Sequence, residues 1–201
     1  HCGACHTPRN FMGAEQKQTA YMQGAFVDGW QAPALTSFNH SPMPWREQDF
    51  FNYLRLGFSG FHGTASGPMA QVVRNLHSVS DEDVQAMAVY LQSRAQTAPP
   101  TASDAPKPAR ISLQVATQGA KVYERQCLQC HGEQGEGIQT ASGEVAYPAL
   151  AGNRAVLLND PTNLVQLVLY GGYGPATAGH PRPFGMPPAV LELDDRDIAA
   201  V

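Results

Sequence analysis

Cysteine and histidine occur together at two places in this 201-residue chain, each time as Cys-x-x-Cys-His. The two motifs are "CGACH", with Cys2, Cys5 and His6, and "CLQCH", with Cys127, Cys130 and His131. They contain all 4 cysteines of the chain. Two cysteines at this spacing can form thioether bonds with both vinyl groups of one haem, while the next histidine places an imidazole nitrogen on its iron. The motifs therefore predict two covalently attached haems c.

Three other uses of the cysteines explain the sequence less well. A redox dithiol needs no histidine in both copies, and it usually lies in a βαβ pattern that this chain lacks. A four-cysteine zinc site would have to join two distant pairs across a proline-rich segment. A disulfide within each pair is geometrically possible, but it gives the histidines no function.

The composition predicts a globular protein and excludes some partners. Hydrophobic residues make up 43% of the chain, and the formal net charge is -4, so the basic surface of a nucleic-acid binder is not expected. The strongest apolar run, "NLVQLVLYGG", is interrupted by Gln166 and is shorter than the ~20 residues of a membrane-spanning helix.

The sequence after each motif repeats in the same order. A Pro-x-Leu segment is followed by an apolar helical stretch, a Gly/Pro-rich loop with a methionine, and an acidic helix start. The helical stretches at 50–56 and 164–169 are predicted to be largely buried and to end at Gly57 and Gly171. The acidic starts at 80–83 and 194–197 are predicted to be helix caps without a catalytic role.

This repeat predicts an all-α fold of two tandem domains, at residues 1–95 and 113–201. Residues 96–112, rich in Pro and Ala, are predicted to be a linker draped outside two docked domains. A helix over residues 115–123 should lead into Cys127, but the first copy lacks its counterpart, and the last helix of the second copy stops early. We therefore expect the chain to be part of a longer protein.

The ligands around each iron can be assigned from the repeat. A ligating histidine needs its second ring nitrogen held by an acceptor. In small cytochromes c, which this pattern resembles, the carbonyl of the proline in Pro-x-Leu has this role, and Pro33 and Pro148 occupy that position. Met69 and Met186, in the loops before the acidic helix starts, are predicted to be the axial sulfur ligands, which raise the potential and leave no open site for substrate.

Several other residues compete for these positions. Met43 is the main rival of Met69, and His62 or His180 would give bis-histidine ligation in place of methionine. Met12, Met22 and Met87 are interpreted as core or loop residues. The candidates to line the first haem are Trp30, Tyr53, Arg55 and Arg9.

The chain resembles the second and third haem domains of the three-haem cytochrome c subunit of bacterial membrane-associated dehydrogenases. The stretches that carry the resemblance are "CGACHTPRNFMGAEQ", "FVDGWQAPALT", "GPMAQVV", "SDEDVQAMAVYL", "YPALAGNRAVLLNDPTNLVQLVLYGG" and "FGMPPAVLELDDRDIAAV". These enzymes include those for alcohols, gluconate, aldehydes and nicotinate. The resemblance implies two class I cytochrome c domains here. It also implies a third haem in a preceding domain, a signal peptide, and membrane attachment through parts outside this chain.

The same resemblance implies electron transfer at the periplasmic side of the bacterial inner membrane. A dehydrogenase subunit of the flavin, quinone-cofactor or molybdenum type would supply electrons, and ubiquinone or a terminal oxidase would accept them. The chain is then not an enzyme on its own. Two alternatives remain open: a free periplasmic dihaem carrier, and a dihaem cytochrome c peroxidase, which two methionine-ligated haems argue against.

Overall fold

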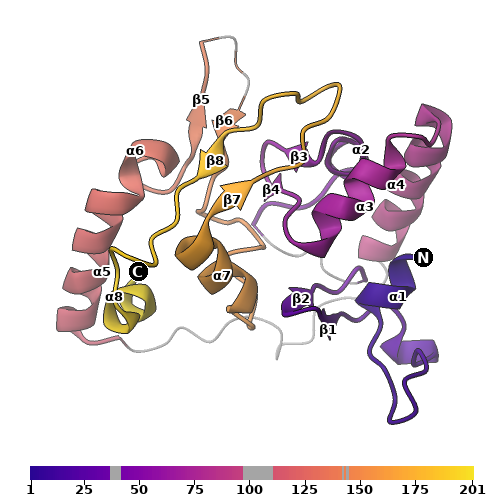
Figure 1. Ribbon diagram of the computed structural model, residues 1–201, viewed down its shortest axis with the longest axis horizontal. Coiled ribbons are helices and arrows are strands. Elements are labelled where there is room, and N and C mark those ends of the chain that lie inside the picture. Colours follow the sequence, from indigo (N-terminus) through magenta and orange to yellow (C-terminus); the bar gives the residue numbers. More distant parts are fainter. Residues whose placement is uncertain (37–41, 97–110, 142, 144) are drawn as a thin grey trace.

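The computed structural model describes residues 1–36, 42–96, 111–141, 143 and 145–201. Most of the predicted linker, residues 97–110, therefore lies outside the described residues. The described chain forms two halves that lie side by side along the long axis of the molecule (Figure 1).

The two halves contain similar but not identical elements. The first half comprises α1 (Cys2–His6), η1 (Gln18–Ala20), β1 (Ala25–Val27), β2 (Trp30–Ala32), α2 (Glu47–Leu56), β3 (Phe58–Ser59), β4 (Gly63–Thr64), α3 (Pro68–Leu76) and α4 (Asp81–Ala95). The second comprises α5 (Leu113–Gln126), α6 (Leu128–His131), β5 (Ile138–Gln139), β6 (Val145–Tyr147), α7 (Thr162–Tyr170), β7 (Gly172–Tyr173), β8 (Gly185–Met186) and α8 (Asp195–Ala200).

The fold is mainly helical, but it is not all-α as the sequence predicted. Four short antiparallel pairs, β1–β2, β3–β4, β5–β6 and β7–β8, interrupt the helices. The β1–β2 hairpin turns at Asp28 (φ 50) and Gly29 (φ +81). Positive φ at both central residues is the type I′ geometry that Asp-Gly favours. These pairs are too short for the periodicity of apolar residues to reveal them.

The main apolar core lies in the first half, between α2 and α4. Phe50 and Leu54 of α2 pack against Val84, Ala88 and Leu91 of α4, and all five are buried. The α2 helix ends at Gly57 in the left-handed conformation (φ 74), as predicted. The Ser80 side chain caps α4 by accepting a hydrogen bond from the Asp83 amide, so the acidic start is confirmed as a cap.

In the second half, α5 crosses α8 at close range. A Cβ at Gly119 would clash with the Ala200 carbonyl, and neighbouring Val122 is buried. Val115, one turn before Gly119 on α5, is 40% exposed. The Asp194 side chain caps α8 by accepting from the amides of Arg196 and Asp197.

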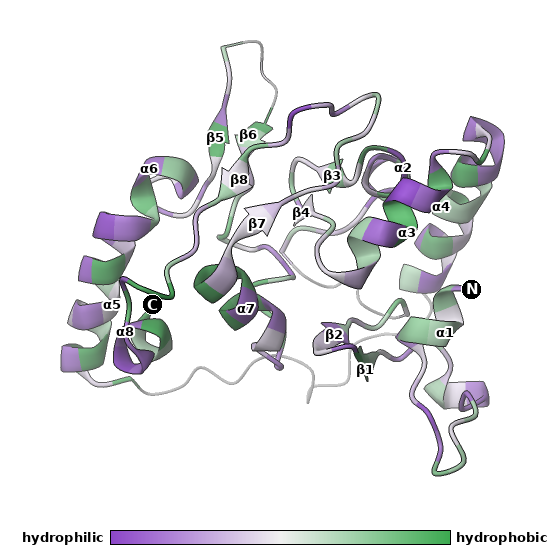
Figure 2. Ribbon diagram, viewed as in Figure 1, coloured by the Kyte–Doolittle hydropathy of each residue, from purple (hydrophilic) through white to green (hydrophobic). Residues whose placement is uncertain are grey.

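The α7 helix differs from the prediction of a largely buried helix. It ends at Gly171, as predicted, and it is strongly apolar (Figure 2), yet none of its residues is fully buried. In the first half α4 packs on α2, the counterpart of α7. In the second half α8 packs on α5, so it does not cover α7 in the same way. Among the described residues, no helix combines the length and apolarity needed to span a bilayer.

The two halves contact one another through specific polar and ring contacts. The Asn163 side chain, on α7, accepts from the Gln31 amide at 2.9 Å and donates to the Gln31 carbonyl at 2.8 Å, on β2. The Thr177 hydroxyl donates to the Leu56 carbonyl, and the His180 ring stacks on Phe58. Figure 1 shows the resulting arrangement, with α7 facing β2 at the centre of the molecule.

Candidate functional site

The two Cys-x-x-Cys-His motifs both form short helical turns. In the first, Cys2 and His6 are the ends of α1; in the second, α6 follows the long α5 helix at Cys127. All four cysteines lie in the described part of the chain, and none of them is in a disulfide. The structure therefore gives the disulfide alternative no support, and it leaves all four thiols free.

A hairpin fixes the imidazole of His6. The Gly24 amide donates to the His6 carbonyl at 2.8 Å, and the β1–β2 hairpin starts at the next residue. The hairpin returns the chain to Pro33, whose carbonyl accepts from the His6 Nδ1–H at 2.7 Å. This bond orients the ring and leaves Nε2 as the metal-binding nitrogen.

The second motif has the same arrangement. The Gly137 amide donates to the His131 carbonyl at 2.8 Å, and β5–β6 then returns the chain to Pro148. The Pro148 carbonyl accepts from the His131 Nδ1–H at 2.9 Å. The hydrogen bonds expected of both Pro-x-Leu segments are thus present in both halves.

The glycines that begin these hairpins are site residues that sequence reasoning missed. Gly24 has φ +90, and a Cβ there would lie 2.9 Å from the Ala32 carbonyl oxygen. Gly137 has φ +78, and a Cβ there would lie 2.9 Å from the Pro148 carbonyl carbon. Only glycine allows both the backbone conformation and this close approach. Their common position, directly before each hairpin, was the signal that could have revealed them.

Burial favours the neutral form of the His6 ring. Desolvation lowers the pKa of His6, the bond to the Pro33 carbonyl opposes it, and the positive charge of Arg154 lowers it further. A neutral imidazole is the form that binds a metal ion.

Both predicted sulfur ligands are half-buried, but neither lies in a loop as the sequence predicted. Met69 is the second residue of α3, which starts at Pro68, where the fixed φ and missing N–H of proline suit a first helical position. Met186 lies on β8, opposite Gly172 of β7. Only tertiary pairing makes this two-residue strand, so no local pattern predicts it.

In both halves an aromatic ring links the histidine side of the site to the methionine side. Trp30, on β2 just before Pro33, covers Gly67, two residues before Met69. Tyr147, next to Pro148, has its ring 5.1 Å from that of Phe184, two residues before Met186.

The competing ligands lie elsewhere. The buried His62 ring stacks on Trp45 with centroids 4.1 Å apart, and its Nε2 lies 3.6 Å from Asp49 Oδ2. The His180 ring packs on Phe58 of the other half. Met43 lies beside Gly152 of the second half. Of the remaining methionines, Met12 is 77% exposed, Met22 is buried and Met87 packs at the edge of the α2–α4 core.

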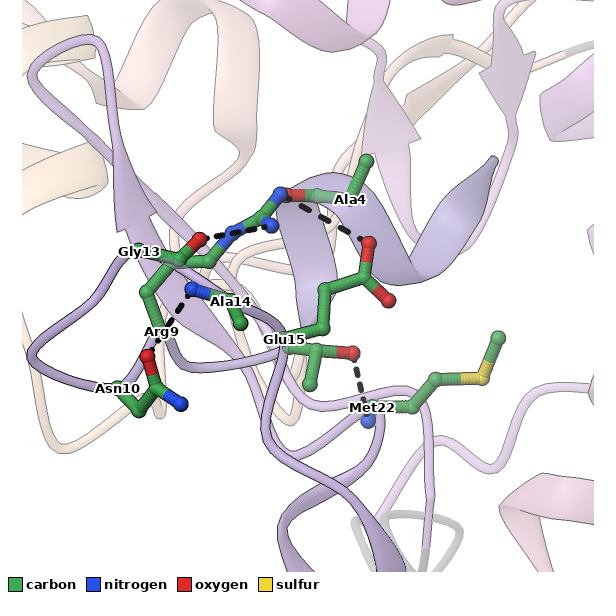
Figure 3. A network of polar contacts seen from close by, with 8 residues as sticks. Ala4, Arg9, Asn10, Gly13, Ala14, Glu15 and Met22 are labelled. Atoms are coloured by element: carbon green, nitrogen blue, oxygen red, sulfur yellow. Dashed lines mark hydrogen bonds and ion pairs between the residues drawn. The ribbon is translucent and has the colours of Figure 1, made fainter.

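The arginines proposed to line the first haem have structural partners. Arg9 donates to the carbonyls of Ala4 and Gly13 and pairs with Glu15 at 3.8 Å, which stiffens the loop after the first motif (Figure 3). In that loop the Asn10 side chain accepts from the Ala14 amide. Arg55 donates to the carbonyls of Leu76 and Val79 and pairs with Asp81. Tyr53 is half-buried, and burial raises its pKa to about 12.

The residues present fit haem c. Each half offers two thiols, an imidazole whose Nδ1 is already engaged, and a half-buried thioether, the donor set of a methionine–histidine haem. The α7 helix adds an apolar surface that the protein itself covers only in part. Within the described residues, no group of three or more His, Cys, Asp and Glu side chains could hold a metal ion, so the zinc alternative is not supported.

This fold and donor set define a c-type cytochrome with two sites. The family model described as cytochrome c matches residues 1–95 and 116–201, and the chain belongs to the cytochrome c family. Domains of this family carry covalently bound haem c.

The relatives place the chain more closely. It is 40% identical to a nicotinate dehydrogenase subunit of Pseudomonas putida, over 99% of this chain and 16% of that protein. It is 34% identical to the fructose dehydrogenase cytochrome subunit of Gluconobacter japonicus, over 100% of this chain and 44% of that protein. It is also 34% identical to the alcohol dehydrogenase (quinone) cytochrome c subunit of Gluconobacter oxydans, over 100% of this chain and 43% of that protein. The resemblance to dehydrogenase cytochrome subunits is confirmed, and the chain spans less than half the length of each relative.

Proposed function

We propose that this chain transfers electrons through two haems c as part of the cytochrome subunit of a bacterial dehydrogenase complex. The observation that carries the proposal is the duplicated histidine site. In both halves a Cys-x-x-Cys-His turn holds an imidazole whose Nδ1–H is bound to a proline carbonyl, at 2.7 Å for His6 and 2.9 Å for His131.

Each haem has its own domain, residues 1–95 and 113–201. The first is attached at Cys2 and Cys5 and ligated by His6 and Met69; the second is attached at Cys127 and Cys130 and ligated by His131 and Met186. Haem iron supplies one-electron chemistry when bound. The protein's part is to hold the imidazoles by the Pro33 and Pro148 carbonyls and to surround the sites with apolar side chains.

The packing of His62 supports methionine ligation in the first domain. Its ring lies between Trp45 and the Asp49 carboxylate, which already engage it. To reach an iron, the ring would have to leave the stacked contact with Trp45 and the half-buried Asp49 carboxylate. Met69 is half-buried at the edge of the α2–α4 core, two residues after the Gly67 that Trp30 covers.

The names of the relatives support a dehydrogenase catalytic subunit as the electron donor. Following the resemblance, we propose ubiquinone or a terminal oxidase as the acceptor, a third haem in a preceding domain, and a periplasmic position at the inner membrane. On its own, this part is an electron carrier and not an enzyme.

Haem stoichiometry tests the site assignment. The chain, produced in a host that matures cytochromes c, should hold two haems that resist acid–acetone extraction. Replacing Cys127 and Cys130 by alanine should leave one. The oxidised protein should show the weak sulfur-to-iron band near the red end, and Met69→Ala should diminish it. Two haems retained in the double variant, or a full band in Met69→Ala, would contradict the assignment.

The native size tests the complex. Purified from its own organism without detergent exchange, the protein should migrate with a dehydrogenase subunit. Migration as a free chain would favour the dihaem carrier, and rapid consumption of peroxide would favour the peroxidase.

A further inference from the structure

A half-buried arginine of the second half reaches the histidine site of the first half. Arg154 lies in the turn after the second Pro-x-Leu segment. Its neighbour Asn153, which is buried, fixes this turn by donating to the Ala149 carbonyl at 2.9 Å and accepting from the Ala155 amide at 2.9 Å. The position of Arg154 is therefore set by the second half.

The guanidinium of Arg154 contacts the first Pro-x-Leu segment. Its Nη2 donates to the Ala34 carbonyl at 3.1 Å. Ala34 directly follows Pro33, whose carbonyl accepts the 2.7 Å hydrogen bond from His6 Nδ1. The arginine contact and the imidazole contact therefore lie on consecutive peptide units, and a cation of the second half lies close to the Pro33 carbonyl that holds the histidine of the first.

This cation is desolvated but charged. Burial lowers the pKa of Arg154 to about 10, which leaves it protonated at neutral pH. A charge in so poorly solvated a place is only weakly screened by water and salt.

We propose that Arg154 raises the reduction potential of the haem attached at Cys2 and Cys5, so that the second domain sets the potential of the first. This inference rests on the proposed function. The ferric centre carries one more positive charge than the ferrous centre, so a nearby fixed cation disfavours oxidation. Because the cation comes from the other domain, docking of the domains and the potential of the first haem are coupled.

Spectroscopic redox titration of the haem-loaded chain tests the proposal. Arg154→Gln should lower the potential of one haem by about 59 mV or more, equivalent to a tenfold change in its ferrous-to-ferric ratio at a fixed applied potential. Arg154→Lys keeps the charge and should retain most of the wild-type potential. The matched control is Lys121→Gln, which removes one exposed positive charge from the same domain and should leave both potentials unchanged.

Two further variants identify which haem responds to the loss of the Arg154 charge. With Cys127 and Cys130 replaced by alanine, only the first haem remains, and Arg154→Gln should still lower its potential. With Cys2 and Cys5 replaced, Arg154→Gln should have no effect. The sulfur-to-iron band should persist in Arg154→Gln, which shows that both axial ligands are kept. Arg154→Leu also removes the charge and must shift the potential in the same direction. It replaces Arg154→Gln in the test if that variant is produced in too small an amount.

Unchanged potentials in both uncharged variants would overturn the proposal, as would an Arg154→Lys protein that behaves like Arg154→Gln. An equal shift of the two haems would also overturn it. These outcomes require a chain that binds haem covalently, so they are distinct from failure of the proposed function, in which no covalent haem is found.

Discussion

Replacing Gly24 by alanine tests whether close packing of the hairpin against the Pro33 segment holds the first histidine. A Cβ at Gly24 would lie 2.9 Å from the Ala32 oxygen, 3.1 Å from the Ala34 nitrogen and 3.3 Å from the Pro33 carbonyl carbon. All three are backbone atoms, so relief requires the segment to move away. That movement would lengthen the 2.7 Å bond between His6 Nδ1 and the Pro33 carbonyl.

The size of the effect can be separated into two parts. A non-glycine residue at φ +90 costs about 1–2 kcal/mol. Overpacking against fixed backbone adds about 1–3 kcal/mol. Gly29→Ala is the matched control, because Gly29 has φ +81 and no heavy atom within 4 Å of its Cβ position. Gly29→Ala should therefore show only the cost of a positive φ. Gly24→Ala also overpacks the backbone, so it should be less stable than Gly29→Ala by about 1–3 kcal/mol.

The assay uses the distribution of tryptophan. The chain has 2 tryptophans, Trp30 and Trp45, and both lie in the first half, so their fluorescence reports unfolding of that half alone. A difference of about 1–3 kcal/mol lowers the Tm by at least ~4 °C relative to the control in a domain of this size. Equal Tm values for Gly24→Ala and Gly29→Ala would refute the packing argument.

Two further perturbations test other contacts. Burial alone would raise the pKa of Asp49, but the nearby His62 ring and hydrogen bonds from the Arg46 amide and the Ser59 hydroxyl hold it below its usual value. Asp49→Asn should therefore destabilise the protein by about 1–3 kcal/mol at neutral pH. Because the pKa of Asp49 is depressed in the folded state, this stabilisation is lost as the pH falls through that pKa, and the stabilities of wild type and variant should converge. A stability difference that stays the same at acidic pH would contradict this. Asn163→Ala removes both bonds to Gln31 and should weaken docking of the halves by about 1–3 kcal/mol. Small-angle scattering in urea should then show expansion at a lower urea concentration than in wild type. Expansion that begins at the same urea concentration in both proteins would contradict a role of the Asn163–Gln31 contacts in docking.

Some features of the site could be predicted because they depend on residues close together in the chain. The spacing of Cys127, Cys130 and His131 within one helical turn decides which groups can bind one haem. The glycine after α2 and the acidic cap of α4 are likewise local, since propensity and hydrogen bonds of neighbouring residues produce them. The repeat then transferred these assignments from one half to the other.

Other features depend on which distant segments pack together. The secondary structure around Met69 and Met186 was predicted wrongly because a two-residue strand exists only through its partner, and because a proline start was interpreted as loop. His62 was left as a possible ligand, since its contacts with Trp45 and Asp49 join residues far apart in sequence.

The sequence by itself therefore determined the chemistry: two haem attachment motifs, their histidines, and a duplicated order of elements around them. Tertiary structure decided how that chemistry is held and tuned. The hairpins that bring Pro33 to His6, the close approach at Gly24, and the contact of Arg154 with Ala34 all join residues from different segments. Covalent attachment requires only neighbouring residues, whereas orientation and electrostatic environment depend on every group that folding brings within range.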